Sequence, residues 1–333
     1  MSEFWVVPGT AAAEVLAACG PEVMATVAGA YQLHEAGASV NPDSYFLRFA
    51  DKPSARVIAL PAYLGGSIDR IGIKWISSFP GNVQRGLPRA SAVLILNDYA
   101  TGAPVACLEA AGISAARTAA SAALTAARLR RGQSGGSVGF VGTGVIATTI
   151  ASYLSLVTSF GEATCYDRDP DRARRFASTV TAALGTPVNV ADDLTRPLRC
   201  DVVVFATTAA GPYVAPETRF APGQVVLNIS LRDLPPEPLL HANNVVDDVE
   251  HCLKAATSPH LVEQQTGSRS FINGTIGRLL EPGLDLDPGR PTIVSPFGLG
   301  ILDIAVGDLV LRRAIATGTA LPIPGFFPSG AAQ

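Results

Sequence analysis

The chain has 333 residues, of which 48% are hydrophobic and 16% are charged, so it can bury a large core and is expected to form two domains. Its formal net charge of −3 argues against a nucleic-acid-binding surface. No apolar run is long enough to span a bilayer, and the N-terminus lacks the basic start of a signal peptide.

Cysteine and histidine usage points to a reduced compartment and to no metal site. The five cysteines are scattered, are odd in number and form no C-x-x-C pair, which is typical of a cytoplasmic protein. The four histidines show no spacing that suits zinc. We therefore expect a cytoplasmic protein with no metal, no nucleic-acid partner and no membrane partner.

The N-terminal third reads as an α+β domain. A helix is predicted over 15–33 and a long Ala-rich helix over 111–131. Between them, short β-prone runs separated by turn signals predict a mostly antiparallel sheet, with strands at 44–49, 56–60, 70–77 and 92–97.

The middle of the chain alternates strands and helices, which predicts a Rossmann-type, doubly wound parallel sheet. Helices are expected over 147–154 and 170–184, and strands over 138–141, 163–167, 188–190, 201–206, 225–229, 245–247 and 292–294. A last helix over 300–317 is expected to return to the first domain, and the Pro-rich tail, 322–333, to be partly disordered. The predicted domains are 1–117 completed by 300–333, and 118–299.

A dinucleotide-binding motif lies at the first strand-to-helix junction of that middle region. Gly142, Gly144 and Ala147 form G-x-G-x-x-A, which suits a tight turn, the approach of a pyrophosphate and close helix packing. Asp167 ends the next predicted strand, where a carboxylate bonds a ribose 2′-hydroxyl and favours NAD over NADP. Arg168 follows directly and weakens that preference. The alternative interpretation is a tight turn without a ligand.

Three cations and one acid are candidate site residues. Arg48, Lys74 and Arg117 each lie in an apolar segment with no acid beside them in sequence, so they could grip substrate carboxylates. Separate surface or salt-bridged cations are the alternative. Asp233 follows the predicted strand 225–229, at the edge where ligands bind in open α/β sheets. It suits a general acid/base or, alternatively, the start of a loop before two prolines.

Taken together, these segments resemble the ornithine cyclodeaminase/μ-crystallin family over nearly the full length. The matching pattern is Arg48, GIKW with Lys74, SAARTAA with Arg117, GFVGTGVIA, NISLRDLPP with Asp233, and PFGLGILD with Asp303. The resemblance implies a homodimer formed through the N-terminal sheet. It also implies that Arg48, Lys74 and Arg117 bind the substrate carboxylate, and that Asp233, with Lys74, is catalytic.

The resemblance further implies NAD as the cofactor. Thr118 is expected to lie near a helix N-terminus and to contact the cofactor. The other expected cofactor-binding residues are Gly142, Thr143, Gly144, Val145, Ile146, Asp167, Arg168 and Thr207.

Details are similar to one branch of the family, in NPDSYFLRF, RASAVLILND and SPFGLGILD. That branch cleaves N-(2-amino-2-carboxyethyl)-L-glutamate oxidatively to L-2,3-diaminopropionate and 2-oxoglutarate, for siderophores or peptide antibiotics. Arg89 and Arg232 would suit such a carboxylate-rich substrate, or else lie on the surface. The alternatives are ornithine cyclodeaminase, which converts ornithine to proline and ammonia, a related imino-acid reductase, and a binding protein without catalysis.

Overall fold

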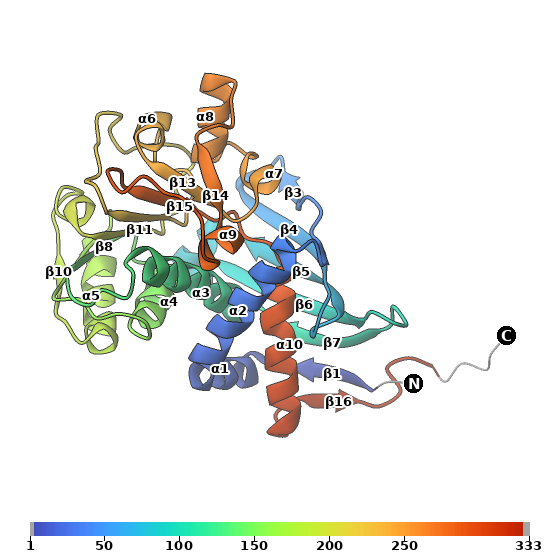
Figure 1. The fold of residues 1–333 in the computed structure, drawn as a ribbon. Coiled ribbons are helices and arrows are strands. Elements are labelled where there is room, and N and C mark those ends of the chain that lie inside the picture. The colour runs from blue at the N-terminus through green and yellow to red at the C-terminus, as the bar shows by residue number, and fades with distance from the viewer. Residues whose placement is uncertain (1–2, 329–333) are drawn as a thin grey trace. The chain divides into compact units, whose positions relative to one another are not determined.

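The computed structural model describes residues 3–328, and its chain divides into two compact units. Unit 1 comprises Met1–Arg117 with Leu299–Gln333, and unit 2 comprises Thr118–Gly298. The boundary lies inside helix α3 (Ala111–Leu129), which begins in unit 1 and continues in unit 2. Figure 1 shows the course of the chain.

Unit 1 is built on an eight-stranded, mostly antiparallel sheet in the order β16-β1-β7-β6-β5-β4-β2, with β3 also paired to β4. The strands are β1 (Phe4–Val7), β2 (Ser39–Val40), β3 (Tyr45–Phe49), β4 (Lys52–Leu64), β5 (Arg70–Ser78), β6 (Ala90–Asp98), β7 (Pro104–Glu109) and β16 (Leu321–Ile323). The other elements are α1 (Gly9–Ala18), α2 (Gly20–Glu35), the short 3₁₀ helix η1 (Pro80–Arg85) and α10 (Gly300–Ala316).

Helix α10 packs on one face of this sheet, against β4, β5 and β6 (Figure 1). Its backbone approaches β6 closely at Gly307, where an added Cβ would lie 2.1 Å from Leu94 Cδ2. The opposite face carries large exposed hydrophobic side chains, with Trp75 45% exposed and Val93 39% exposed in neighbouring strands. One face of the sheet is therefore core and the other is an apolar surface.

Unit 2 is a Rossmann-type domain. Its eight strands are all parallel, in the order β10-β9-β8-β11-β12-β15-β13-β14. They are β8 (Ser137–Val141), β9 (Glu162–Tyr166), β10 (Val188–Val190), β11 (Val202–Phe205), β12 (Val225–Asn228), β13 (Asn243–Val246), β14 (Ile272–Thr275) and β15 (Thr292–Ser295). The helices are α4 (Val145–Leu154), α5 (Pro170–Leu184), η2 (Pro197–Arg199), α6 (Pro236–Leu240), α7 (Val249–Cys252), α8 (Ser258–Thr266) and α9 (Ile276–Leu280).

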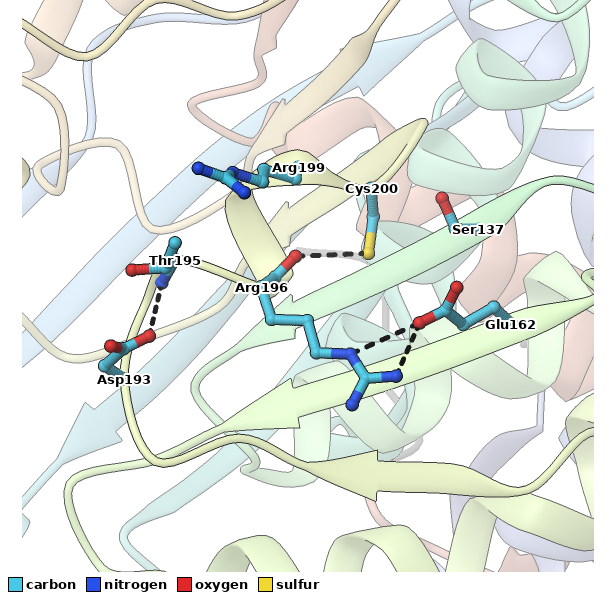
Figure 2. A pocket seen from close by; sticks show the side chains of 7 residues that line it. All are labelled: Ser137, Glu162, Asp193, Thr195, Arg196, Arg199 and Cys200. Atoms are coloured by element: carbon cyan, nitrogen blue, oxygen red, sulfur yellow. Dashed lines mark hydrogen bonds and ion pairs between the residues drawn. The ribbon is translucent and has the colours of Figure 1, made fainter.

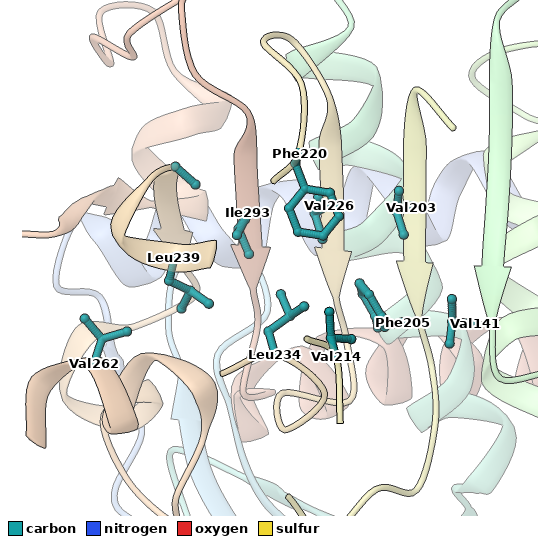
Figure 3. Packing of buried hydrophobic residues seen from close by; sticks show 11 residues of the cluster. Val141, Val203, Phe205, Val214, Phe220, Val226, Leu234, Leu239, Val262 and Ile293 are labelled. Atoms are coloured by element: carbon teal, nitrogen blue, oxygen red, sulfur yellow. The ribbon is translucent and has the colours of Figure 1, made fainter. Parts of the chain in front are cut away.

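The order of the strands reverses between β8 and β11, which creates the crevice where such sheets bind ligands. The central strands are buried on both faces, as their unbroken runs of apolar residues predict. Figure 3 shows one side of this core, where Val203, Phe205 and Val226 pack with Leu234 and Leu239. The carboxyl ends of these strands are thus held by a rigid frame.

The predicted fold class and most predicted elements are confirmed, with differences mainly in unit 1. The helix predicted over 15–33 is wrong as a single helix, because the chain bends by 91° between α1 and α2 at Cys19. Gly20 and Pro21 open the second helix, and Pro21 cannot donate the hydrogen bond that would continue the first. Strands β1, β2, β7, β14 and β16 were not predicted.

The tail, which is predicted to be partly disordered, is ordered over its described residues. Strand β16 pairs with β1, and Phe326 stacks on Phe4 with ring centroids 3.9 Å apart. Residues 329–333 lie outside the described residues. Over residues 3–328, no single helix is long and apolar enough to cross a membrane. Helices α1 and α2 together have the length and apolar composition of a membrane span, but they are bent by 91°.

Candidate functional site

The glycine motif forms the turn between β8 and α4 in unit 2. Gly142 has φ +87°, and an added Cβ would lie 2.6 Å from the Ala206 carbonyl oxygen, so only glycine fits there. Gly144 caps α4, and its nearest neighbour for an added Cβ is Arg172 at 3.9 Å. The space beside Gly144 and the free N–H groups at the start of α4 fit the pyrophosphate of a dinucleotide.

Asp167 lies directly after β9, beside this turn. Its Oδ2 accepts hydrogen bonds from the Thr143 backbone nitrogen at 2.9 Å and the Thr143 hydroxyl at 2.8 Å, and its Oδ1 accepts from the Asp169 nitrogen at 3.0 Å. Burial alone would raise the pKa of Asp167, but these hydrogen bonds and the charge of Arg172 lower it. The carboxylate is therefore ionised and fixed, as a ribose ligand requires.

Three of the other predicted cofactor residues lie beside this turn, and Thr118 lies within helix α3. Val145 is 75% exposed at the start of α4, with Ile146 next to it, and Arg168 is exposed after β9. Thr118 is not near a helix N-terminus as expected, because α3 begins seven residues earlier, at Ala111. A cavity of about 340 Å³ beside the turn is also lined by Arg172, which was not predicted.

Asp233 is completely buried in unit 2, after β12, and hydroxyl groups surround its carboxylate. The Thr207 hydroxyl donates to Oδ1 at 2.5 Å, and the Ser230 hydroxyl donates to Oδ2. Thr207, which was predicted to bind cofactor, thus contacts the predicted acid/base. The backbone nitrogen of Tyr213 also donates to the Asp233 carbonyl oxygen at 3.2 Å.

The loop that carries Asp233 has an unusual backbone. Leu231 adopts φ +67°, a left-handed conformation that is costly for a branched side chain, and the same side chain is buried. The Arg232 guanidinium donates to the Ala255 carbonyl oxygen at 2.8 and 3.2 Å. Arg232 is predicted to bind substrate, whereas these bonds tie its guanidinium to the neighbouring loop at Ala255.

A second polar centre is buried in unit 1, where Lys74 and Arg117 meet Asp303. Lys74 Nζ lies 2.6 Å from Asp303 Oδ2 and 3.0 Å from the Ser114 hydroxyl, and Arg117 Nε lies 3.2 Å from Asp303 Oδ1. Lys74 is 2% exposed and Asp303 is 0% exposed. Burial lowers the pKa of Lys74 to about 8, with Asp303 opposing and Arg117 adding to this effect.

Arg48 belongs to a row of cations further along the same sheet face. In register, Arg48 lies opposite Arg56 on β4, and Arg56 lies opposite Ser78 on β5. Arg89 donates to the Ser78 hydroxyl at 2.8 Å. Arg56 Nε is buried and has no hydrogen-bond partner among the described residues. Burial, and then the charge of Arg48, lower the pKa of Arg56.

This arginine row is separate from the Lys74 centre. Since Lys74 and Ser78 are four residues apart on one strand face, about 13 Å separates the two places. The structure thus brings Lys74 and Arg117 together, and brings Arg48 close to Arg56. The predicted cation trio therefore falls into two groups, Lys74 with Arg117 of helix α3, and Arg48 with Arg56.

A cavity of about 250 Å³ lies at the amino ends of β8 and β9, and it does not fit the predicted NAD-binding or substrate-binding site (Figure 2). Its Arg196 is paired with Glu162 at 2.7 Å, and both side chains are about half exposed. Parallel α/β sheets bind their ligands at the carboxyl ends of the strands, which is the opposite edge.

Sequence reasoning missed several residues of these centres. In the sequence, Asp303 stands out only as part of the PFGLGILD motif, although it is the partner of both buried cations. Arg56 lies in a polar stretch, and its role becomes visible only through the register of β3, β4 and β5. Tyr213 follows a Gly-Pro turn and carried no recognisable signal.

Known proteins share this architecture and these motifs. The family model for the ornithine cyclodeaminase/mu-crystallin family matches residues 9–314. The chain is 31% identical to alanine dehydrogenase of Archaeoglobus fulgidus over 92% of this chain and 94% of that protein. It is 29% identical to N-((2S)-2-amino-2-carboxyethyl)-L-glutamate dehydrogenase of Staphylococcus aureus over 78% of this chain and 79% of that one.

A solved archaeal alanine dehydrogenase, a dimer with bound NAD, superposes with a TM-score of 0.86 at 28% identity, covering 97% of this chain and 100% of that chain. Together with the dinucleotide turn, these relatives confirm the predictions of an NAD-dependent dehydrogenase and of NAD as its cofactor. The chain belongs to the ornithine cyclodeaminase/mu-crystallin family.

Proposed function

We propose that the protein cleaves N-(2-amino-2-carboxyethyl)-L-glutamate oxidatively, with NAD, to L-2,3-diaminopropionate and 2-oxoglutarate. The product would serve the biosynthesis of a siderophore or a peptide antibiotic. The likeness to the Staphylococcus aureus dehydrogenase supports this substrate, as does the arrangement of cations in unit 1. The alanine dehydrogenase relatives make alanine the main competing substrate.

The observation that carries the proposal is the arginine row of Arg48, Arg56 and Arg89. Alanine and ornithine each have one carboxylate, which Lys74 and Arg117 can bind without help from the row. The proposed conjugate has three carboxylates, so that the row, about 13 Å from Lys74, can bind a second one. The buried Nε of Arg56 without a described partner is the kind of donor that a carboxylate satisfies.

In this proposal each unit binds a different reactant. Residues 1–117 with 300–333 bind substrate, and residues 118–299 bind NAD, which supplies a hydride acceptor when bound. Lys74 and Arg117, oriented by Asp303, fix the carboxylate next to the reacting carbon. Asp233 accepts a proton from the water that hydrolyses the imine, and returns it to the leaving amine.

The test is a substrate panel with purified protein and NAD, followed by NADH absorbance. We expect one NADH for each molecule of conjugate, with 2-oxoglutarate released in equal amount, and far slower reaction with L-alanine. Ornithine cyclodeaminase would regenerate NAD and accumulate no NADH from ornithine. An imino-acid reductase would instead consume NADH. Faster oxidation of L-alanine than of the conjugate would contradict the proposal.

Variants of the arginine row test the second carboxylate. Removing one partner of a desolvated charge pair typically costs about 2–5 kcal/mol, so Arg56→Ala should raise KM for the conjugate about 30-fold or more. The same variant should leave KM for a one-carboxylate substrate nearly unchanged. Arg117→Ala should weaken both substrates and spare NAD binding. Arg85→Ala, on the exposed turn η1, is the matched control.

We also propose a homodimer formed through the apolar face of the unit 1 sheet. Tyr45, Trp75 and Val93 lie in one cross-strand row, where Tyr45 is 70% exposed. A contiguous exposed apolar face of this kind suits association with a second copy. Light scattering should give twice the chain mass for the native protein and a monomer for Trp75→Glu. A native monomer would exclude this interface.

A further inference from the structure

One buried serine binds the loop that carries Asp233. Ser258, the first residue of α8, is 0% exposed, and its backbone nitrogen donates to the Leu231 carbonyl oxygen at 2.6 Å. Its hydroxyl lies 3.0 Å from the same carbonyl oxygen and 2.7 Å from the Leu234 carbonyl oxygen. Ser258 therefore contacts the backbone on both sides of Asp233.

The two segments that meet here both have costly backbone conformations. Leu231 has φ +67°, and Ala255 and Ala256, which lead into α8, have φ +53° and +52°. A left-handed conformation is unfavourable for residues with a side chain and persists only where surrounding contacts impose it. Arg232, from the first segment, also donates to the Ala255 carbonyl oxygen at 2.8 and 3.2 Å. The bonds between the two segments therefore offset the cost of these conformations.

The Ser258 hydroxyl is the part of this contact that a substitution can remove. It has a single proton, which lies between the carbonyl oxygens of Leu231 and Leu234. Without the hydroxyl, the Leu234 oxygen loses this donor and the Leu231 oxygen keeps the backbone bond. The free energy of one buried hydrogen bond is similar in size to the cost of one strained residue. Its loss can therefore let the Leu231 backbone relax and shift the residues that follow.

We propose that Ser258 is a positioning residue, whose hydroxyl holds the Asp233 carboxylate in place through the backbone of residues 231–234. The carboxylate itself is bound by the hydroxyls of Thr207 and Ser230, so Ser258 acts on it through the main chain. A general acid/base works within hydrogen-bond reach of the group it protonates. A small shift of the loop should therefore slow the reaction without weakening the binding of either reactant. The inference rests on the proposed acid/base role of Asp233.

The kinetic test compares Ser258→Ala with Thr164→Val. Thr164 is also 0% exposed in unit 2, and its hydroxyl donates to the Asn189 carbonyl oxygen at 3.1 Å, three strands away from β12. Urea unfolding should show a similar loss of stability in both variants. In Ser258→Ala, kcat should fall about 10- to 100-fold with KM and NADH affinity unchanged, whereas Thr164→Val should keep the native kcat. A native kcat in Ser258→Ala, or an equal loss of kcat in both variants, would overturn the proposal.

A second substitution tests whether the hydroxyl acts through the strained backbone. Glycine adopts a left-handed conformation without cost, so Leu231→Gly should keep the loop in place even without the Ser258 hydroxyl. Adding Ser258→Ala to Leu231→Gly should then lower kcat by less than about threefold. If the loss of the buried leucine side chain prevents folding, Leu231→Asn takes its place, because asparagine also tolerates this conformation. An equal loss of kcat in the native and substituted backgrounds would contradict action through this backbone.

Hydrogen exchange tests the same contact without any turnover. The backbone nitrogens of Tyr213 and Val214 both donate to the Asp233 carbonyl oxygen at 3.2 Å, so their exchange reports the position of Asp233. Followed by mass spectrometry, their exchange should be about tenfold faster in Ser258→Ala and unchanged in Thr164→Val. Native exchange in Ser258→Ala would overturn the proposal. If Asp233→Asn turns over at the native rate, or the native protein oxidises no amine, the proposed function fails, and this exchange alone decides whether Ser258 holds the loop.

Discussion

Two buried carboxylates, one in each unit, have opposite surroundings. Asp303 in unit 1 is bound by two cations, Lys74 at 2.6 Å and Arg117 at 3.2 Å. Asp233 in unit 2 is bound by hydroxyl groups from Thr207 and Ser230. Both acids are 0% exposed. Burial alone therefore does not distinguish a structural acid from a catalytic one, and the chemistry of the partners does.

The groups that bind each carboxylate determine how much free energy its protonation costs. Asp303 is the counter-charge of two buried cations, and removing that counter-charge would leave both of them unpaired. Protonating Asp233 leaves only hydroxyl groups, which can turn from donating to accepting. From this difference we propose that Asp303 positions the two cations and that Asp233 transfers protons.

Removing the acid of the cation centre should cost the most. Asp303→Ala leaves Lys74 and Arg117 buried without a counter-charge, and breaking such a pair typically destabilises a protein by about 3–5 kcal/mol. Urea unfolding should show this loss. Asp308→Ala, further along α10, is the control, because its partners Arg70 and Arg312 are 26% and 62% exposed. Equal losses in both variants would contradict the special role of the Asp303 centre.

Asp233→Asn should affect catalysis and leave the fold intact. Asparagine has nearly the same shape and still accepts a hydroxyl hydrogen bond, but it cannot take up a proton. We expect kcat to fall about 100-fold or more, with NADH affinity unchanged. Asp247→Asn offers a contrast in the same unit, since Asp247 is buried and accepts from the Gly298 backbone nitrogen at 2.6 Å. That variant should lose stability instead. Native turnover in Asp233→Asn would return this loop to a structural role.

Asp167 extends the comparison to a third carboxylate, held mainly by backbone nitrogens. Asp167→Ala should weaken NAD binding by about 10- to 100-fold, because hydrogen bonds to a charged group contribute about 1.5–3 kcal/mol. NADP binding should weaken less, since its 2′-phosphate no longer meets a negative charge. Fluorescence titration with both reduced cofactors measures this. Asp169→Ala, which only uncaps α5, is the control. A native preference for NADP would refute the role of Asp167.

How far these centres could be predicted depended on whether the signal was local in sequence. The dinucleotide turn was predictable because Gly142, Gly144 and Ala147 lie within six residues, and each has its own geometric reason. Lys74 was noticed as a cation in an apolar run, yet its partner Asp303 lies 229 residues away. No spacing rule links two such positions, because the packing of α10 on β5 brings them together.

The remaining errors also have physical causes. The bend between α1 and α2 had a local signal in Gly20 and Pro21, which the apolar periodicity on either side obscured. Arg56 could not be found, because cross-strand neighbours follow from register, and a shift of one residue turns a side chain to the other face. Tyr213 depends on how two strand-end loops fold against each other, which sequence periodicity does not describe.

A pH dependence also separates the two centres. Burial lowers the pKa of Lys74 to about 8, so its ammonium, and with it the grip on a carboxylate, is lost as pH rises through that value. We expect kcat/KM of the native enzyme to fall by up to tenfold per pH unit above about 8. Lys74→Arg keeps its charge and should lack this decline, whereas Asp233→Asn should keep it. A native profile that stays flat up to pH 10 would contradict this effect.

The stability of unit 1 should change in the opposite direction over the same range. Because the folded pKa lies below the ordinary value of 10.5, the unfolded chain holds more protons between pH 8 and 10.5. The cost of burying a charged lysine is therefore fully present below pH 8 and disappears as pH rises to 10.5. Urea unfolding at pH 7.5 and 9.5 should show the native protein gaining stability relative to Lys74→Met. If the difference between the two proteins does not change with pH, Lys74 is not titrating in this window, and the lost grip cannot explain any fall in kcat/KM.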